Sequence, residues 1–160
     1  SNLSGRARSV NFITGKTYWE VKMVYRGDFS LTVKPAMGLL LNSVPAEEAL
    51  GATLATGWAL FPNGKYYNAT LQGASGVGNV AVNDVVMFAV DPAAGKLWFG
   101  KNGTWVGNPV AGTGATFTNI PVGATTLRAA VELTDKEVVT ANFMAAHLVY
   151  SPPSGFVSLA

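Results

Sequence analysis

The side chains able to carry out catalysis are few and scattered in this chain. There is one histidine, His147, and no cysteine. Nucleophilic catalysis needs an activated group beside a base, and His147 stands in the run Ala145–Val149 without such a partner. The G-x-S-x-G nucleophile motif is also absent from the sequence. We therefore predict a packing or surface role for His147.

The acidic residues, 9 in number, are further candidates for acid–base chemistry. A glycosidase needs two carboxylates about 5–9 Å apart, and β-sandwich glycosidases carry them along one strand as E-x-D-x-E, a run that is missing here. Glu20 and Glu132 lie on strand faces that alternation predicts to point outward. Asp84 and Asp91 flank one strand as turn residues. We predict that the protein is not an enzyme.

Metal and phosphate binding have little support in the sequence. Calcium takes several oxygen ligands from closely spaced acidic or amide side chains, and the nearest candidates, Asn83-Asp84 and Asp91, are explained by turn chemistry. The glycine-rich run Gly73–Gly78 lacks the G-K-[ST] ending and the following helix of a phosphate loop. We interpret it as a flexible connection, and we predict no metal and no cofactor.

Composition narrows the classes of partner. Charged residues make up 12% of the chain, against about 25% in an average domain. The net charge is +2 and no block of like charges occurs, so we expect no nucleic-acid partner. No apolar run is long enough to span a bilayer, so we expect no membrane insertion. The absence of cysteine excludes disulfides and thiolate metal sites.

The elements that would position any site are short strands, most clearly in the stretch 83–103. Val85–Val90 is an unbroken apolar run, which is typical of a strand buried on both faces. Asp91–Gly95 contains the proline and glycine of a tight turn. Lys96–Lys101 resumes as a strand, and Asn102-Gly103 is a strong hairpin signal. This order of parts predicts antiparallel β structure.

Further strands are predicted at short intervals, namely Thr17–Tyr25, Phe29–Val33, Met37–Leu41, Thr56–Phe61, Lys65–Leu71, Leu127–Leu133 and Val138–Phe143. In the first, alternation puts Trp19, Met23 and Tyr25 on one face. We expect the last two to pair across Thr134-Asp135. Many short strands without a helical period predict an all-β, two-sheet antiparallel sandwich. We interpret residues 1–11 as a lead-in, with 1–2 typical of a tag remnant, and residues 12–160 as one domain.

The chain carries a series of short motifs in a fixed order, namely Gly15–Val21, Met37–Leu40, Leu50-Gly51, Gly57–Leu60, Gly64–Asn68, Asn83–Gly103, Leu127–Leu133, Ala141–Phe143 and Pro152–Phe156. In type and order these motifs resemble the SPRY domain family. The resemblance implies a concanavalin-like jelly roll with a core of Trp19, Trp58, Phe88, Phe99, Phe143 and Phe156. The run Gly100–Trp105, with Asn108-Pro109 and Gly112–Gly114, is similar to the bacteriophage and bacterial branch found in virion or tail-associated proteins.

SPRY domains bind partners through loops at one rim of the sandwich, and the resemblance implies where these loops fall. They map to residues 26–28, 42–49 and 134–137, where the charged side chains are Arg26, Asp28, Glu47, Glu48, Asp135 and Lys136. Tyr67 and Trp105 are added as aromatics able to stack on sugars or anchor a partner. The alternative for Trp105 is that it covers a sheet edge.

The resulting hypothesis is a non-catalytic recognition or structural module of a phage tail or other virion protein. Its loops would bind a protein partner or a surface glycan, and its location would be the virion. One alternative is a lectin-like host-attachment domain in which Trp105 and Tyr67 share a shallow groove. Another is a pure assembly element that packs against other virion subunits.

Overall fold

The protein is an all-β sandwich in the computed structural model, which describes residues 5–25, 35–44, 49–51, 55–134 and 136–160. The described strands are β1 (Gly5–Arg8), β2 (Thr17–Tyr25), β3 (Ala36–Leu41), β4 (Gly57–Leu60), β5 (Lys65–Asn68), β6 (Thr70–Ala74), β7 (Val85–Asp91), β8 (Lys96–Lys101), β9 (Thr104–Trp105), β10 (Leu127–Leu133), β11 (Val138–Asn142) and β12 (Val157–Ser158). One short 3-10 helix, η1 (Ala145–His147), follows β11.

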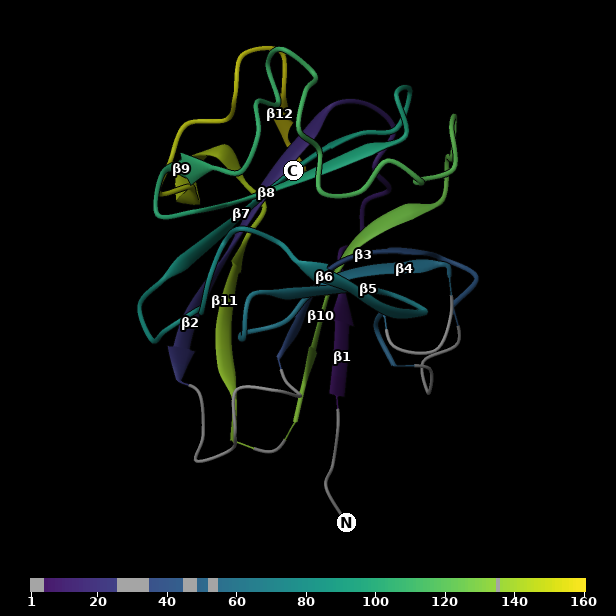
Figure 1. Ribbon diagram of the computed structural model, residues 1–160. Helices are drawn as coiled ribbons and strands as arrows, with labels where there is room; N and C mark the ends of the chain where they lie inside the picture. Colours follow the sequence, from purple (N-terminus) through teal and green to yellow (C-terminus); the bar gives the residue numbers. More distant parts are fainter. Residues whose placement is uncertain (1–4, 26–34, 45–48, 52–54, 135) are drawn as a thin grey trace.

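Two sheets pack face to face (Figure 1). The first sheet has the order β1-β10-β3-β4-β5-β6, and the second has the order β11-β2-β7-β8-β9 with β12 beside β2. Neighbouring strands are antiparallel except β12 on β2. The main core lies between the sheets and includes Trp19, Trp58, Phe88 and Phe99. The predicted two-sheet antiparallel sandwich is confirmed.

The β7–β8 hairpin forms where the sequence predicts it. β7 is buried along its whole length, as expected for a continuous apolar run in the middle of a sheet. Gly95 closes the turn after it with φ 66. At the other end of β8, Asn102 and Gly103 have φ 51 and 84, the pair of positive values that a type I′ turn requires.

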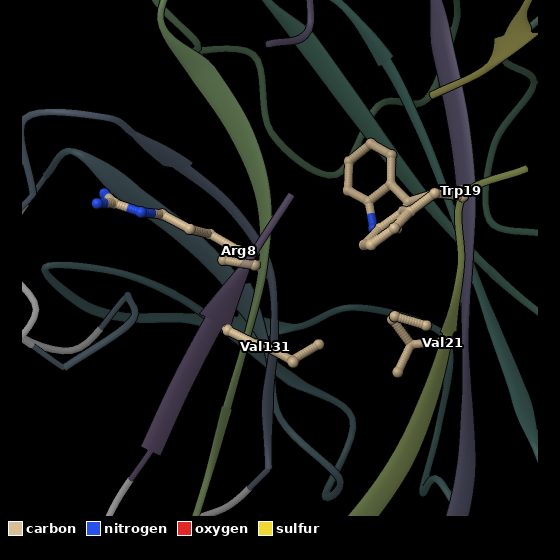
Figure 2. Close-up of a pocket in the computed structure, with 8 residues that line it drawn as sticks. Arg8, Trp19, Val21 and Val131 are labelled. Atoms are coloured by element: carbon tan, nitrogen blue, oxygen red, sulfur yellow. The ribbon is translucent and has the colours of Figure 1, made fainter. Parts of the chain in front are cut away.

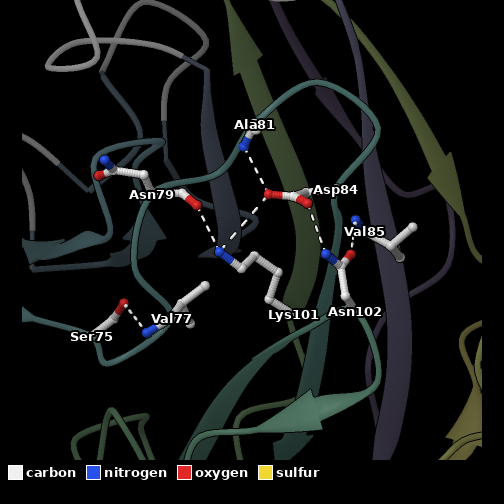
Figure 3. A network of polar contacts seen from close by, with 8 residues as sticks. All are labelled: Ser75, Val77, Asn79, Ala81, Asp84, Val85, Lys101 and Asn102. Carbon is white, nitrogen blue, oxygen red and sulfur yellow. Dashed lines mark hydrogen bonds and ion pairs between the residues drawn. The ribbon is translucent and has the colours of Figure 1, made fainter.

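Polar contacts tie the Asn102-Gly103 turn to the segment before β7 (Figure 3). The Asn102 side chain accepts a hydrogen bond from Val85 N–H at 2.8 Å and donates one to Asp84 at 2.7 Å. Lys101 Nζ lies 3.8 Å from the Asp84 carboxylate and donates to the Asn79 carbonyl at 2.7 Å. Asp84 therefore acts as the structural turn residue that the sequence predicts.

The glycine-rich run Gly73–Gly78 differs from the flexible connection that we predicted, because it is held against the sandwich. Ser75 is buried and its hydroxyl donates to the Gly64 carbonyl at 2.7 Å. The Ser75 hydroxyl oxygen also accepts a hydrogen bond from Val77 N–H at 3.2 Å (Figure 3). Val77 itself belongs to the main core. The chain follows a tight path here. Gly64, which contacts this run, has no room for a side chain, because a Cβ would lie 2.6 Å from the Gly78 carbonyl oxygen.

Several strands differ from the predictions. β11 pairs with β2 in the second sheet, so the predicted hairpin with β10 across Thr134-Asp135 is wrong. Gly5–Arg8 lies within the predicted lead-in, yet it forms the edge strand β1 beside β10. The predicted strand Lys65–Leu71 is split into β5 and β6, because the chain reverses at Ala69 with φ 62. The predicted strand Phe29–Val33 falls outside the described residues.

Glu20, predicted to point into solvent, is fully buried at 0% exposure. It lies on the outer face of the second sheet, which the chain after β11 covers. Its carboxylate accepts hydrogen bonds from Tyr18 Oη at 2.7 Å, Val149 N–H at 2.8 Å and Tyr150 N–H at 2.7 Å. The prediction is wrong because a covering segment distant in sequence brings its own donors to the carboxylate.

Glu132, on the first sheet, was also predicted to point into solvent, and this prediction is wrong as well. It is 6% exposed, and its carboxylate accepts a hydrogen bond from Leu50 N–H at 2.5 Å. The Arg6 guanidinium of β1 lies 3.8 Å from the same carboxylate oxygen. Each sheet therefore carries one buried glutamate on its outer face, and each glutamate binds the backbone of the segment that covers that face.

The Tyr18 phenol gives a pH dependence that can be measured. Burial, then the hydrogen bond and charge of Glu20, raise the pKa of Tyr18 well above its ordinary value of 10.0. The folded protein therefore keeps a proton that the unfolded chain loses above pH ~10. This contribution to stability is full below pH ~10 and falls by up to about 1.4 kcal/mol per pH unit above it. We expect Tyr18→Phe to flatten the decline in urea midpoint between pH ~9 and ~11, whereas an unchanged slope would contradict this assignment.

Candidate functional site

The side chains able to do chemistry do not converge in the part of the chain that the structure describes. His147 is exposed on η1. Glu20 and Glu132 lie in different sheets, on the two outer faces of the sandwich. Within the described residues, no group of three or more His, Cys, Asp or Glu could hold a metal ion, and no helix there is long and apolar enough to cross a membrane.

Several strands end together at one end of the sandwich, which we call the rim and define by Tyr25, Leu133, Lys136 and Val138. The strand register places Tyr25, the last residue of β2, opposite Val138, the first residue of β11. Leu133, the last residue of β10, lies opposite Gly5. Ala36, the first residue of β3, lies opposite Glu132, the residue before Leu133. The β2–β3 and β10–β11 connections therefore leave from the same end.

The predicted loop 42–49 approaches the rim only at its far end. Leu50, which follows this loop, donates its N–H to Glu132, the residue that precedes Leu133 on β10. Asn42 begins the loop at the opposite end of β10, where its N–H donates to the Thr126 carbonyl. On the β10–β11 connection, the Glu137 carboxylate accepts a hydrogen bond from Thr134 N–H at 2.8 Å. The strands that flank the predicted loops 26–28 and 134–137 thus end at one side of a rigid scaffold, and the chain after loop 42–49 lies near the same side. Recognition surfaces usually lie on loops held in this way.

Exposed apolar side chains at the rim were missed by the sequence interpretation. Tyr25 and Val138 are both 48% exposed, and they are direct cross-strand partners. Alternation along Thr17–Tyr25 placed Tyr25 on the core face, and this is wrong because β2 runs past the end of the core. The one indication of this exposure in the sequence is the position of Tyr25, which immediately precedes a predicted turn.

The other predicted site residues are placed as follows. Lys136 is exposed at the rim, with φ 75. Tyr67 and Trp105 are both partly buried and lie away from the rim residues in register. Five fall outside the described residues, namely Arg26, Asp28, Glu47, Glu48 and Asp135.

Tyr67 and Trp105 do not form the shared groove that a lectin-like site would need. Tyr67 packs on Phe61, with ring centroids 4.5 Å apart, on the outer face of the first sheet. Trp105 packs edge-on against Tyr18, with centroids 6.0 Å apart, on the outer face of the second sheet. The two rings are therefore on opposite sides of the sandwich. The contact with Tyr18 gives Trp105 a covering role on its sheet.

Comparison with known proteins agrees with this architecture. The sequence model of the SPRY domain matches residues 16–146. The fold is similar to the crystal structure of the SPRY domain of human HERC1, with a TM-score of 0.67, 17% identity, and coverage of 89% of this chain and 84% of that chain. A search of curated protein sequences finds no match. Because the SPRY match spans most of the chain, from the start of β2 to η1, this protein belongs to the SPRY domain family.

Proposed function

We propose that this protein is a non-catalytic recognition module that binds a protein partner at the rim. SPRY domains are generally protein-interaction modules. The observation that carries the proposal is the exposed pair of Tyr25 and Val138, at the end of the sandwich from which the predicted loops 26–28 and 134–137 leave. Tyrosine offers a large contact area with a polar tip, and such residues often supply most of the binding energy at interfaces.

The chemistry of the rim indicates the kind of partner. Tyr25 and Val138 offer an apolar centre, and the exposed residue Lys136 lies just before Val138 in the chain. Protein interfaces combine an apolar centre with a polar border in this way. We infer that the partner presents an apolar side chain to this pair and a polar or acidic border to Lys136.

We expect rim variants to lose binding without losing stability. The probe is a random peptide library displayed on phage and selected against the immobilised domain. For selected peptides, Tyr25→Ala should weaken binding about thirtyfold or more, since anchor residues at interfaces contribute about 2 kcal/mol or more. Val138→Ala should weaken it less. The thermal midpoint should change little, because both side chains are half exposed.

Val122 provides the matched control. It is 74% exposed and follows Ile120, whose N–H bonds Gly95 in the turn after β7. Val90, just before that turn, pairs with Thr17. Thr17 is the first residue of β2 and Tyr25 is its last, so Val122 lies toward the end of the sandwich away from the rim. Val122→Ala should therefore leave peptide binding unchanged. Peptides that bind equally to the wild type and to Tyr25→Ala would show that recognition occurs elsewhere.

We further propose a phage setting, with the domain as part of a tail or other virion protein. Its support is the similarity of Gly100–Trp105 and the glycine-rich segment after it to the phage branch of the family. The test is binding of the purified domain to intact bacterial cells, before and after enzymatic removal of surface glycans. Binding that survives removal would favour a protein receptor, and binding that is lost would favour a glycan. No binding in either case would favour a role in virion assembly.

A further inference from the structure

A small pocket opens between the two sheets on the side where β1 and β11 are the edge strands. It has a volume of about 50 Å³. Its walls come from Ala7 and Val131 on one sheet and from Val21, Ala141 and Phe143 on the side of the other. Trp19 also lines the pocket, across from β1 and β10 (Figure 2). Apart from one indole N–H, these side chains offer no hydrogen-bonding group.

That indole N–H belongs to Trp19, which is 0% exposed. Its nitrogen has no hydrogen-bond acceptor within the part of the chain that the structure describes. Figure 2 shows this nitrogen on the side of the ring that faces β1 and β10 across the pocket. The ring cannot easily turn away, because it stacks on Phe88 at 5.1 Å with an interplanar angle of 5°.

The other buried indoles show that the missing acceptor at Trp19 is unusual in this fold. Trp58 Nε1 donates to Asn119 Oδ1 at 2.9 Å, and Trp98 Nε1 donates to the Thr113 carbonyl at 2.9 Å. A buried donor without an acceptor costs about 1–3 kcal/mol, so an occupant that supplies an acceptor would be favoured. We propose that the pocket binds a small neutral molecule or group with an apolar body and one acceptor oxygen, which accepts the Trp19 indole N–H.

The lining distinguishes this occupant from water and from an acid. A buried water normally makes two to four hydrogen bonds. The side chains that face into this pocket offer one donor, the Trp19 indole N–H, because Arg8 lines the pocket with its stem alone (Figure 2). A carboxylate would need a cation, but the Arg8 guanidinium points away from the pocket and donates to the Asn42 carbonyl at 3.3 Å (Figure 2). The chemistry therefore favours a ketone, ester or ether oxygen on a short apolar group.

A second hollow continues the site outward. It has a volume of about 280 Å³, and it shares Arg8 and Phe143 with the first pocket. Its lining includes Val10 and Met144, which are 88% and 46% exposed. A ligand longer than the inner pocket would therefore place the rest of its apolar body along this surface.

The test uses acetone and isobutene, which have the same shape but differ in the acceptor oxygen. In ¹⁵N-labelled protein, acetone should move the Trp19 indole N–H resonance downfield and should saturate. The Trp58 and Trp98 resonances should stay in place, since their N–H groups are already bonded. Isobutene can fill the same space without supplying an acceptor, so it should give no downfield shift of the Trp19 resonance. Trp19→Phe assigns the resonance.

Ala7→Leu keeps the proposal testable if Trp19→Phe does not fold. Ala7 lies on the exposed edge strand and lines the pocket, so leucine there should fill it and abolish the acetone response. Ala93→Leu, at an exposed turn position, should leave the response intact. A linear shift without saturation, or an equal response in Ala7→Leu, would overturn the proposal. So would a bound water in exchange contact with the Trp19 N–H that acetone does not displace.

Discussion

Glu20→Gln should destabilise the protein by about 3–5 kcal/mol, although the two side chains have nearly the same shape. The carboxylate accepts hydrogen bonds from Tyr18, Val149 and Tyr150, and its residue is fully buried. A glutamine amide has one acceptor oxygen, so its NH₂ group would face a backbone N–H that also donates. Loss of a charge-assisted bond and an orphaned buried donor both add to the cost. Urea unfolding at neutral pH measures the change.

The location of the loss can be tested separately. Hydrogen exchange at the Val149 and Tyr150 amides should accelerate in Glu20→Gln more than exchange in β7, because these amides lose their acceptor. Glu137→Gln is the matched control, since that carboxylate accepts one backbone N–H from Thr134 within a local turn. It should cost about 1 kcal/mol or less. Equal losses for the two variants would show that Glu20 does not hold the covering segment.

The central hairpin could be predicted because its determinants are local. The apolar run Val85–Val90 specifies a buried strand, and Asn102-Gly103 specifies the turn through residues that tolerate positive φ. The pairing of β11 could not be predicted in this way. Adjacency in sequence favoured β10 as its partner, whereas the structure carries the chain to the other sheet beside β2. Only long-range packing decides between these two edges.

The burial of Glu20 and Glu132 shows the same limit. Alternation indicates correctly that each side chain lies on the face opposite the main core. It cannot show that a distant segment covers that face and brings backbone donors, as Tyr150 does for Glu20 and Leu50 does for Glu132. A lone carboxylate in a strand therefore looks solvated from local sequence alone.

The family resemblance implied binding loops at 26–28 and 134–137, and the strands beside them end at the rim, where Lys136 is exposed. Their role in binding stays a prediction. Tyr25 was assigned to the core because periodicity describes the two faces of a strand but not where the opposing sheet ends. Tyr67 and Trp105 were predicted to share a groove, but Tyr67 lies on the outer face of the first sheet and Trp105 on that of the second. Which outer face a strand residue joins depends on sheet order, and sheet order is not encoded in the strand itself.

Gly38→Ala should be among the most damaging single-methyl additions in this protein. Gly38 lies in β3, in the interior of the first sheet, opposite Ala59 on β4. A Cβ at this position would lie 2.0 Å from the Trp58 carbonyl oxygen, which is backbone and cannot rotate aside. The two strands would have to separate, so their ladder and the packing of Trp58 in the main core would both suffer. We expect a loss of about 3 kcal/mol or more, or failure to fold.

Gly15→Ala is the matched control for this prediction. A Cβ at Gly15 meets no atom within 4 Å, and its backbone needs no positive φ. The substitution should therefore change stability by about 0.5 kcal/mol or less, and it should tend toward stabilisation because alanine restricts the unfolded chain. Both variants add the same methyl group, so the difference between their urea midpoints isolates the contact with β4. A Gly38→Ala protein as stable as Gly15→Ala would mean that β3 and β4 can separate at little cost, and the close approach of their backbones would then not be what requires glycine at this position.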